Sequence, residues 1–205
     1  MCIVVINRLH VDALSNEQLW DALKQDDQGA FAELYQRLHA TLYSYGYKVA
    51  ANATLVEDAI QDLFVDVWRM RHSSSSANSV KFYLFRSLRR KLHLLSEKEH
   101  WSETPSAQVD ITSVDNSAEQ LMIGQEQESQ LIQRLTYALA QLPQRQQEVV
   151  TLRFYQNFKT SEIAQIMGIT EKSVRNTLQK ALLNLREQAP YLAPLLGLLL
   201  FWLLA

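Results

Sequence analysis

The chain has 205 residues, 47% of them hydrophobic, and its formal net charge is −2. That length suffices for one or two modest domains with hydrophobic cores, and the single cysteine excludes an intrachain disulfide framework and a multi-cysteine metal site. Only five glycines and four prolines interrupt the chain, and β-branched alternation is scarce. We therefore expect an all-α protein with no metal and no cofactor, in a reducing cytoplasmic environment.

The small net charge hides two segments of opposite sign. Residues 69–93 contain seven Lys or Arg and no acid, whereas residues 99–128 contain seven Asp or Glu and no Lys or Arg. The net sum argues against a nucleic-acid binder. A cationic surface and an anionic segment can nevertheless cancel in the total while they lie apart in space, so a basic binding surface stays open as an interpretation.

Residues 15–98 have the pattern of a helical domain. Residues 1–14 precede it and stay unassigned, because their apolar start has no basic residue before it and is too short for a signal-peptide core. Ser15 is a typical helix N-cap. Apolar residues then recur at helical spacing in three segments, 19–23, 31–49 and 55–68. We expect three consecutive helices.

The helix expected at 55–68 is strongly amphipathic and acidic. Its polar face carries four carboxylates and one amide: Glu57, Asp58, Gln61, Asp62 and Asp66. Carboxylates four residues apart repel each other, and this face offers no cation, so we expect a basic partner surface outside the chain to compensate them. A solvated face is the simpler alternative. A metal site is a third, which we do not expect because a di-iron bundle needs paired Glu-x-x-His motifs and the chain has one, at 97–100.

A polar loop at 72–79 leads into a basic helix at 80–95. Aromatic and leucine side chains form an apolar stripe on this helix, and we expect Phe82 and Phe85 in the core. Five cations lie largely off the stripe: Lys81, Arg86, Arg89, Arg90 and Lys91. Cations of one sign on an exposed face suit the phosphates of a nucleic-acid backbone. The alternative is that these cations are only solvated.

Residues 99–129 lose the helical period and are rich in Ser, Thr, Asn, Gln and acid, so we expect a flexible linker between two domains. Residues 130–188 then form the second small helical domain. Pro143 is placed to end one helix and to begin the next. The side chains expected to line that next helix are Val149, Val150, Leu152 and Phe154.

Residues 160–185 have the spacing of a helix-turn-helix. Two short amphipathic segments meet at Gly168, which can adopt the positive φ that ends a helix. Ile169 can fill the angle between the two helices, Thr170 can cap the second one, and Ala164 is small where the helices would cross. In such a unit the second helix enters the major groove of DNA.

Six side chains lie off the apolar stripe of the second helix: Lys172, Ser173, Arg175, Asn176, Gln179 and Lys180. They combine cations suited to phosphate or guanine with amides suited to adenine, and we expect them to contact DNA. The alternative is an ordinary helical hairpin with a solvated polar face.

Over residues 18–97 and 130–187 the sequence resembles the extracytoplasmic-function sigma factors of bacterial RNA polymerase. The opening helices of that family resemble LKQDDQGAFAELYQRL, its polymerase-binding helix VEDAIQDLFVDVW, and its promoter-opening helix KFYLFRSLRRKL. Its final domain is similar to LPQRQQEVVTLRF followed by SEIAQIMGITEKSVRNTLQKALLNLRE. The stretches occur in the family's order and at its spacing.

The resemblance implies partners for both charged helices. Core RNA polymerase would be bound by Asp58, Gln61 and Asp62, which match the family's contact with the clamp helices of the largest subunit. The loop 72–79 matches the one that captures a flipped base of the minus-ten promoter element, and the five cations that follow it would contact that element. Arg90 stands where many members have Asn. The six side chains of the helix-turn-helix would read the minus-thirty-five element.

The resemblance also implies that the acidic linker runs near the polymerase active centre and that an anti-sigma factor is a further partner. The sequence has no evident nucleophile, paired catalytic carboxylates or phosphate-binding loop, so we do not expect an enzyme. Two rival interpretations remain. A stand-alone helix-turn-helix transcription regulator would leave the first domain without a role, and a membrane-associated regulator would use the C-terminal tail.

Residues 189–205 form an apolar tail that the resemblance does not cover. The 14 residues from Leu192 to Ala205 would extend about 21 Å as a helix, which is short of the roughly 30 Å of a bilayer core. Pro194 also interrupts the start of such a helix. We expect the tail to occupy a protein groove, with shallow membrane contact as the alternative.

Overall fold

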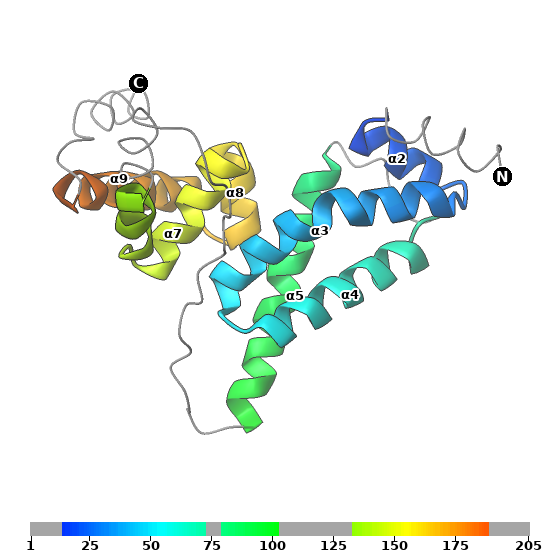
Figure 1. The fold of residues 1–205 in the computed structure, drawn as a ribbon, viewed down its shortest axis with the longest axis horizontal. Helices are drawn as coiled ribbons and strands as arrows, with labels where there is room; N and C mark the ends of the chain where they lie inside the picture. The colour runs from blue at the N-terminus through cyan, green and yellow to red at the C-terminus, as the bar shows by residue number, and fades with distance from the viewer. Residues whose placement is uncertain (1–13, 73–78, 103–132, 189–205) are drawn as a thin grey trace, which may run out of the picture.

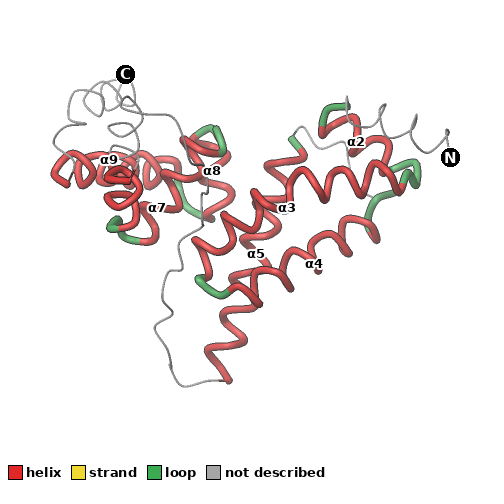
Figure 2. Tube along the Cα trace, in the orientation of Figure 1, coloured by secondary structure: helices red, strands yellow, loops and turns green. Residues whose placement is uncertain are grey.

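The computed structural model describes residues 14–72, 79–102 and 133–188, which form two groups of helices (Figure 1). The first group contains α2 (Asn16–Leu23), α3 (Gln28–Ala50), α4 (Ala53–Arg69) and α5 (Val80–Ser102). The second contains α7 (Gln144–Val150), the π-helical η1 (Thr151–Tyr155), α8 (Thr160–Met167) and α9 (Glu171–Gln188), preceded by a helical segment at 133–140. The described residues contain no strand (Figure 2), which confirms the expected all-α class.

Polar side chains fix the starts of α2, α3 and α4. The Ser15 hydroxyl accepts a hydrogen bond from the Gln18 amide at 3.2 Å, and the Gln18 side chain accepts one from the Ser15 amide at 2.8 Å. Asp27 accepts from the Ala30 amide at 3.0 Å, and Asn52 from the Leu55 amide at 3.1 Å. These bonds satisfy amides that the first turn of a helix leaves without partners.

The first group has one core, in which α3, α4 and α5 pack against one another and α2 covers one end. Leu34, Leu42, Ile60, Phe85 and Leu88 are fully buried in it. Helices α3 and α4 pack closely at Gly46. A Cβ atom at this position would lie 2.8 Å from Val56 Cγ1 and 3.5 Å from Leu92 Cδ1. The absence of a side chain at Gly46 therefore sets the spacing of these helices.

The second group encloses a smaller core, and a π-helical turn changes its expected lining. Val149, Val150 and Leu152 are buried as predicted. The Gln156 amide donates to the Thr151 carbonyl at 3.0 Å, five residues back, and this wider turn rotates the following side chains relative to an α-helix. Phe154 is consequently 43% exposed, so its predicted place in the core is wrong, and Phe158 is buried instead at 4% exposure.

The two groups lie against each other: α5 contacts α8, and α3 contacts α7 (Figure 1). Helix α5 continues to Ser102, so the first residues of the predicted linker are helical. The rest of the linker, the N-terminal segment, residues 73–78 and the apolar tail lie outside the described residues. Within the described ranges, no helix has the length and apolar character needed to cross a membrane.

Replacing Gly46 with Ala should destabilise the first group by about 1–3 kcal/mol, the usual range for an overpacked core site. Helix propensity alone would favour Ala over Gly, so a loss must come from the overlap with Val56. Thermal unfolding followed by circular dichroism measures the effect. Ser44→Ala changes an exposed residue of the same helix and is the control. A melting temperature of Gly46→Ala at or above that of the unaltered chain would contradict the packing described here.

Candidate functional site

The acidic face of α4 is only partly compensated within the chain. Lys91 Nζ of α5 lies 2.6 Å from Asp66 Oδ2, and His39 Nε2 of α3 lies 3.2 Å from Glu57 Oε2. The prediction that all four carboxylates need an outside partner is therefore wrong for Asp66, which Lys91 neutralises. Glu57 has a hydrogen-bond partner in His39. Both partners lie on neighbouring helices, so the sequence of α4 alone does not reveal them.

The remaining two carboxylates of α4 face solvent. Asp58 and Asp62 are exposed, one helical turn apart, and neither has an ion-pair partner among the described residues. Gln61 is exposed between them. The side chains predicted for a protein contact thus form one continuous solvent-facing patch.

An aromatic groove adjoins this patch between α3 and α4. Its volume is about 630 Å³, and its lining includes Phe31, Tyr35, Gln61, Phe64, Val65 and Trp68. The rings contact one another, with centroids 5.2 Å apart for Phe31 and Trp68 and 4.9 Å apart for Tyr35 and Phe64. Val65 is 53% exposed. An open apolar groove beside two unpaired acids suits a partner that presents an apolar side chain together with basic ones.

The five cations predicted to bind nucleic acid have different surroundings on α5. Arg86 and Arg90 are exposed. Lys91 is held by Asp66, as described above. Lys81 Nζ donates to the Gln156 carbonyl at 3.0 Å, and Arg89 binds Glu148. The second group of helices therefore occupies two of the five side chains.

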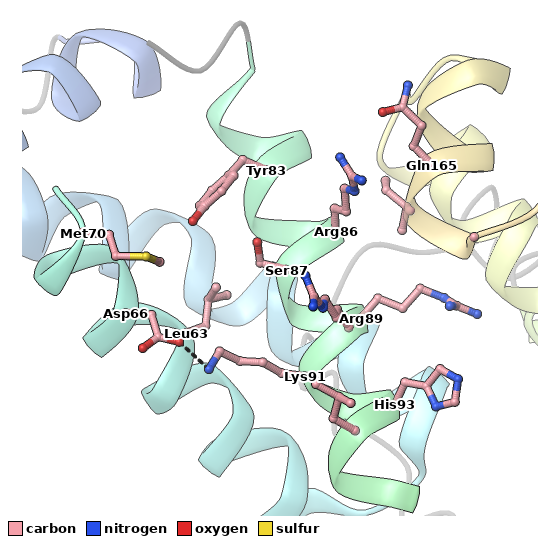
Figure 3. Close-up of a pocket in the computed structure, with 14 residues that line it drawn as sticks. Leu63, Asp66, Met70, Tyr83, Arg86, Ser87, Arg89, Lys91, His93 and Gln165 are labelled. Carbon is pink, nitrogen blue, oxygen red and sulfur yellow. Dashed lines mark ion pairs between the residues drawn. The ribbon is translucent and has the colours of Figure 1, made fainter. Parts of the chain in front are cut away.

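A cleft separates these cations from the helix-turn-helix (Figure 3). It has a volume of about 750 Å³, and its lining includes Arg86, Arg89, Arg90 and Lys91 on one side and Gln165, Ile166 and Gly168 on the other. Figure 3 shows Arg86 extending from α5 toward the side that carries Gln165, while Lys91 turns back toward Asp66. The basic face of α5 is thus covered in part by α8.

Glu148 of α7 is the centre of the contact between the two groups. Its side chain is 8% exposed. Arg89 donates from Nε to Glu148 Oε1 at 2.7 Å, with Nη2 at 3.5 Å from Oε2, and the Tyr45 hydroxyl donates to Oε1 at 2.9 Å. A buried carboxylate is tolerated only when it is paired and hydrogen-bonded, and here α5 supplies the charge and α3 the hydroxyl.

The pKa values of the two donors reflect this site. Burial raises the pKa of the Tyr45 phenol well above its usual value, and the negative charge of Glu148 and the hydrogen bond to it act in the same direction. For Arg89, burial alone would lower the pKa, but the hydrogen bond and charge of Glu148 raise it. The phenol therefore stays protonated and the guanidinium charged.

Further contacts surround the Glu148 site. Phe158 packs edge-on against Phe85, with ring centroids 5.2 Å apart. Lys81 Nζ lies 5.5 Å from the centroid of the Phe158 ring. Gln144 Nε2 donates to the Val49 carbonyl at 2.6 Å. Apolar, cationic and backbone groups from α3, α5, α7 and the loop after η1 thus meet at this interface.

Sequence reasoning missed this interface. Phe85 was assigned to the core, which is correct, since it is fully buried. The apolar period at 31–49 includes position 45 without indicating a role for the Tyr45 hydroxyl, and the expected lining of the helix after Pro143 does not include Glu148. A signal was present: Glu148 precedes Leu152 by four residues and therefore lies on the apolar face of its helix, where an acid requires a partner.

The helix-turn-helix has the predicted local geometry. Gly168 has a φ of 65° and ends α8, Ala164 is buried, and the Thr170 hydroxyl accepts from the Ser173 amide at 3.2 Å at the start of α9. Ile169 is partly buried against the core. The bend between α8 and α9 thus follows from the four residues identified in the sequence.

The polar face of α9 is open to solvent in this arrangement. Lys172, Arg175, Asn176 and Lys180 are exposed, and Ser173 and Gln179 are half-buried. Arg175 Nη1 lies 3.5 Å from Glu171 Oε2, an exposed pair that contributes little to stability.

Within the described ranges, no group of three or more His, Cys, Asp or Glu side chains is placed to hold a metal ion.

Two family models match the chain. Sigma-70 region 2 matches residues 34–100, and Sigma-70, region 4 matches residues 132–185. The first model covers most of α3, α4 and α5, with the acidic patch and the basic face. The second covers α7 to α9 up to residue 185, with the helix-turn-helix.

Curated relatives agree with these matches. The ECF RNA polymerase sigma factor BldN of Streptomyces coelicolor is 25% identical over 182 residues, which cover 87% of this chain and 67% of that protein. The ECF RNA polymerase sigma factor RpoE of Cereibacter sphaeroides is 25% identical over 162 residues, covering 78% of this chain and 87% of that protein.

Solved structures share the fold. CnrH in complex with the cytosolic domain of CnrY aligns with a TM-score of 0.55 at 20% identity, covering 84% of this chain and 95% of CnrH. The sigma factor RpoE in complex with the anti-sigma factor NepR from Bartonella quintana aligns with a TM-score of 0.58 at 20% identity, covering 77% of this chain and 95% of that one.

Tyr45→Phe should lower stability at pH 8 by about 1.5–3 kcal/mol, the usual contribution of a hydrogen bond to a charged group. Because the folded-state pKa of Tyr45 is raised, its contribution is fully present below the usual phenol pKa of about 10 and is lost as the pH rises through the folded-state pKa. The stability gap between the unaltered chain and Tyr45→Phe should therefore narrow above pH 10 in thermal unfolding series.

Tyr137→Phe, which changes a tyrosine that is 69% exposed, is the control and should match the unaltered chain throughout. A gap for Tyr45→Phe that is absent at pH 8, or that widens above pH 10, would rule out the buried hydrogen bond to Glu148.

Proposed function

The chain is a sigma factor of the extracytoplasmic-function group, and we propose that it binds core RNA polymerase and directs transcription initiation at promoters that carry minus-ten and minus-thirty-five elements. The observation that carries this proposal is the coexistence of two surfaces in one chain. An exposed acidic patch lies on α4, and an exposed cationic and amide face lies on α9. The first suits a protein and the second suits DNA.

The polymerase contact is assigned to Asp58, Gln61 and Asp62. All three are exposed on consecutive turns of α4, and the two acids have no internal ion pair among the described residues. Gln61 also lines the aromatic groove between α3 and α4. A basic partner helix with one apolar side chain would therefore find charge and apolar contact on the same surface.

The minus-ten element is assigned to the basic face of α5. Arg86 and Arg90 are exposed and accessible to phosphates. Lys81, Arg89 and Lys91 would join them once their present partners release them. Trapping an unstacked base would offset the few kcal/mol that strand separation requires.

The minus-thirty-five element is assigned to α9, through Lys172, Ser173, Arg175, Asn176, Gln179 and Lys180. The geometry of the helix-turn-helix supports insertion of α9 into a major groove. Two modest readers joined in one chain gain specificity when both engage DNA at the correct spacing, and polymerase would fix that spacing.

Sigma factors are not a class of catalyst, and in this proposal the chain directs the enzyme to which it binds. An anti-sigma factor is proposed as a second protein partner. The support is the fold that the chain shares with the sigma factor RpoE, which was solved with the anti-sigma factor NepR.

Charge reversal of the acidic patch, Asp58→Lys with Asp62→Lys, should abolish co-purification with core RNA polymerase. Loss of a close charge pair at an interface typically costs about 2–5 kcal/mol, and reversal adds repulsion. The measurement is a pull-down with purified core polymerase, with circular dichroism as a test of folding.

The matched control reverses two exposed acids one turn apart on α2, Glu17→Lys with Asp21→Lys. It alters the net charge equally and should bind polymerase normally. If the α4 variant binds as well as this control, the acidic patch is only solvated.

Arg175→Ala and Asn176→Ala should each relax the preference for one base pair of the upstream element. A lost bidentate base contact changes discrimination by about 1–3 kcal/mol, whereas a lost phosphate contact weakens all sites alike. Selection from a randomised promoter library with polymerase present separates these outcomes. Arg186→Ala, an exposed change in the last turn of α9, is the control and should leave the preference unaltered. Uniform weakening by Arg175→Ala would reassign Arg175 to phosphate.

A further inference from the structure

Two cations of α5, Lys81 and Arg89, have a partner within the chain and a second, proposed partner in DNA. In the proposed function they bind promoter DNA, yet Arg89 is bound to Glu148 and Lys81 to the Gln156 carbonyl. A glutamate carboxylate and a phosphate are both anionic acceptors for a guanidinium. Glu148 occupies the Nε edge of the Arg89 guanidinium and neutralises its charge, so a DNA phosphate competes with Glu148 for that edge and for that charge.

We propose that the contact of Glu148 with Arg89 and Tyr45 is a latch, which holds the two groups of helices in a closed form and competes with single-stranded promoter DNA for α5. The effect on DNA rests on the proposed function, whereas the closure itself does not. In the closed form α9 stays accessible, whereas two cations of the basic face of α5, Lys81 and Arg89, are held by the second group.

The contact has the features of a defined interface. Glu148 is buried and receives donors from two different helices, so its position is specified from two directions. Phe158 is buried at 4% exposure, and it reaches that burial through Phe82 and Phe85 of the other group, with ring centroids 6.4 Å and 5.2 Å away. Separating the groups would expose an aromatic cluster to water, and this loss of apolar burial favours closure. The hydration that Glu148 and Arg89 regain on separation offsets the loss of their ion pair.

Other features keep the closed form from being permanent. Burial at the interface lowers the pKa of Lys48 and of Lys81, which means that closure partly removes both ammonium groups from water. Opening restores their hydration and frees Arg89 for a new anion. Interfaces between domains of one chain are generally reversible for such reasons, and a partner that binds only the open form would shift the population.

The position of α9 gives the latch a selective effect. Helix α8 contacts α5, whereas Lys172, Arg175 and Lys180 of α9 are exposed in the same arrangement. Closure therefore occupies part of the proposed DNA-binding surface of α5 and leaves that of α9 open. An open variant should gain affinity for single strands, while duplex binding by α9 stays the same.

The test compares Glu148→Gln with the unaltered full-length chain. Glutamine keeps the shape of the side chain but removes the charge that holds Arg89. Two spin labels, placed at Gln36→Cys in α3 and Leu183→Cys in α9 with Cys2→Ser, report the separation of the groups by double electron–electron resonance. Both label sites are exposed. We expect one narrow distance distribution for the unaltered chain and a longer, broader one for Glu148→Gln.

The second readout is anisotropy of fluorescein-labelled oligothymidine, a single strand that reports binding by cations without a promoter sequence. The apparent affinity scales with the open fraction, so Glu148→Gln should bind at least about threefold more tightly. Adding Arg89→Ala to Glu148→Gln should remove this gain, because Arg89 is the side chain that the latch releases. Glu187→Gln changes an exposed acid on α9 and should behave as the unaltered chain in both readouts.

Circular dichroism checks that Glu148→Gln is folded. Tyr45→Phe removes the other hydrogen-bond donor to Glu148, and we expect it to lengthen the label distances and raise the oligothymidine affinity by less than Glu148→Gln does. Unchanged label distances in both variants would overturn the latch. Longer distances with unchanged oligothymidine affinity would overturn the competition with DNA and would count against the proposed role of α5. A failure to bind polymerase would change neither the label distances nor the oligothymidine affinity, so the two proposals can fail separately.

Discussion

The arrangement of the two helical groups depends on one buried carboxylate. Glu148 sits at 8% side-chain exposure, in an environment where an unpaired charge would be strongly unfavourable. Removing the charged partner of such a carboxylate typically costs about 3–5 kcal/mol, a large part of the stability of a small domain. The requirement for partners fixes Arg89 and Tyr45, and through them it fixes α7 against α3 and α5. The contact of α8 with α5 and the cleft between them follow from that orientation.

Helices α4 and α5 each serve the core and a surface. Leu63 and Phe64 of α4 are buried while Asp58 and Asp62 face solvent, so the residues that stabilise the fold also orient the acidic patch. On α5, Leu88 is buried and the cations occupy the other faces, where α4 holds Lys91 and α7 holds Arg89. Helix α9 differs, because the other described elements leave Lys172, Arg175, Asn176 and Lys180 on its polar face exposed. The two surfaces proposed to bind DNA therefore differ in how much the rest of the described structure covers them.

Local features of this fold could be predicted from the sequence, because their causes lie within a few residues. Ser15 caps α2 through the Gln18 amide, and Gly168 adopts the positive φ that ends α8. The exposure of Asp58 on α4 and of Arg175 on α9 can also be predicted from helical period alone. These features need no knowledge of what packs against the helix.

Features that depend on distant partners could not be predicted in this way. The π-helical hydrogen bond from Gln156 to Thr151 has no simple sequence pattern, and it exchanged Phe154 for Phe158 in the core. The ion pair of Asp66 joins residues of two helices, and the Tyr45–Glu148 bond spans 103 positions. Such contacts arise from tertiary packing, which the period of one helix does not encode.

The most direct test of the account is reconstituted transcription with purified core RNA polymerase, a genomic DNA template and this chain, followed by sequencing of the transcript 5′ ends. If the proposed function is correct, transcript starts occur only when the chain is added, and they lie downstream of one shared pair of sequence elements at constant spacing. Transcript starts that do not depend on the chain, or chain-dependent starts without a shared two-element sequence, would contradict it.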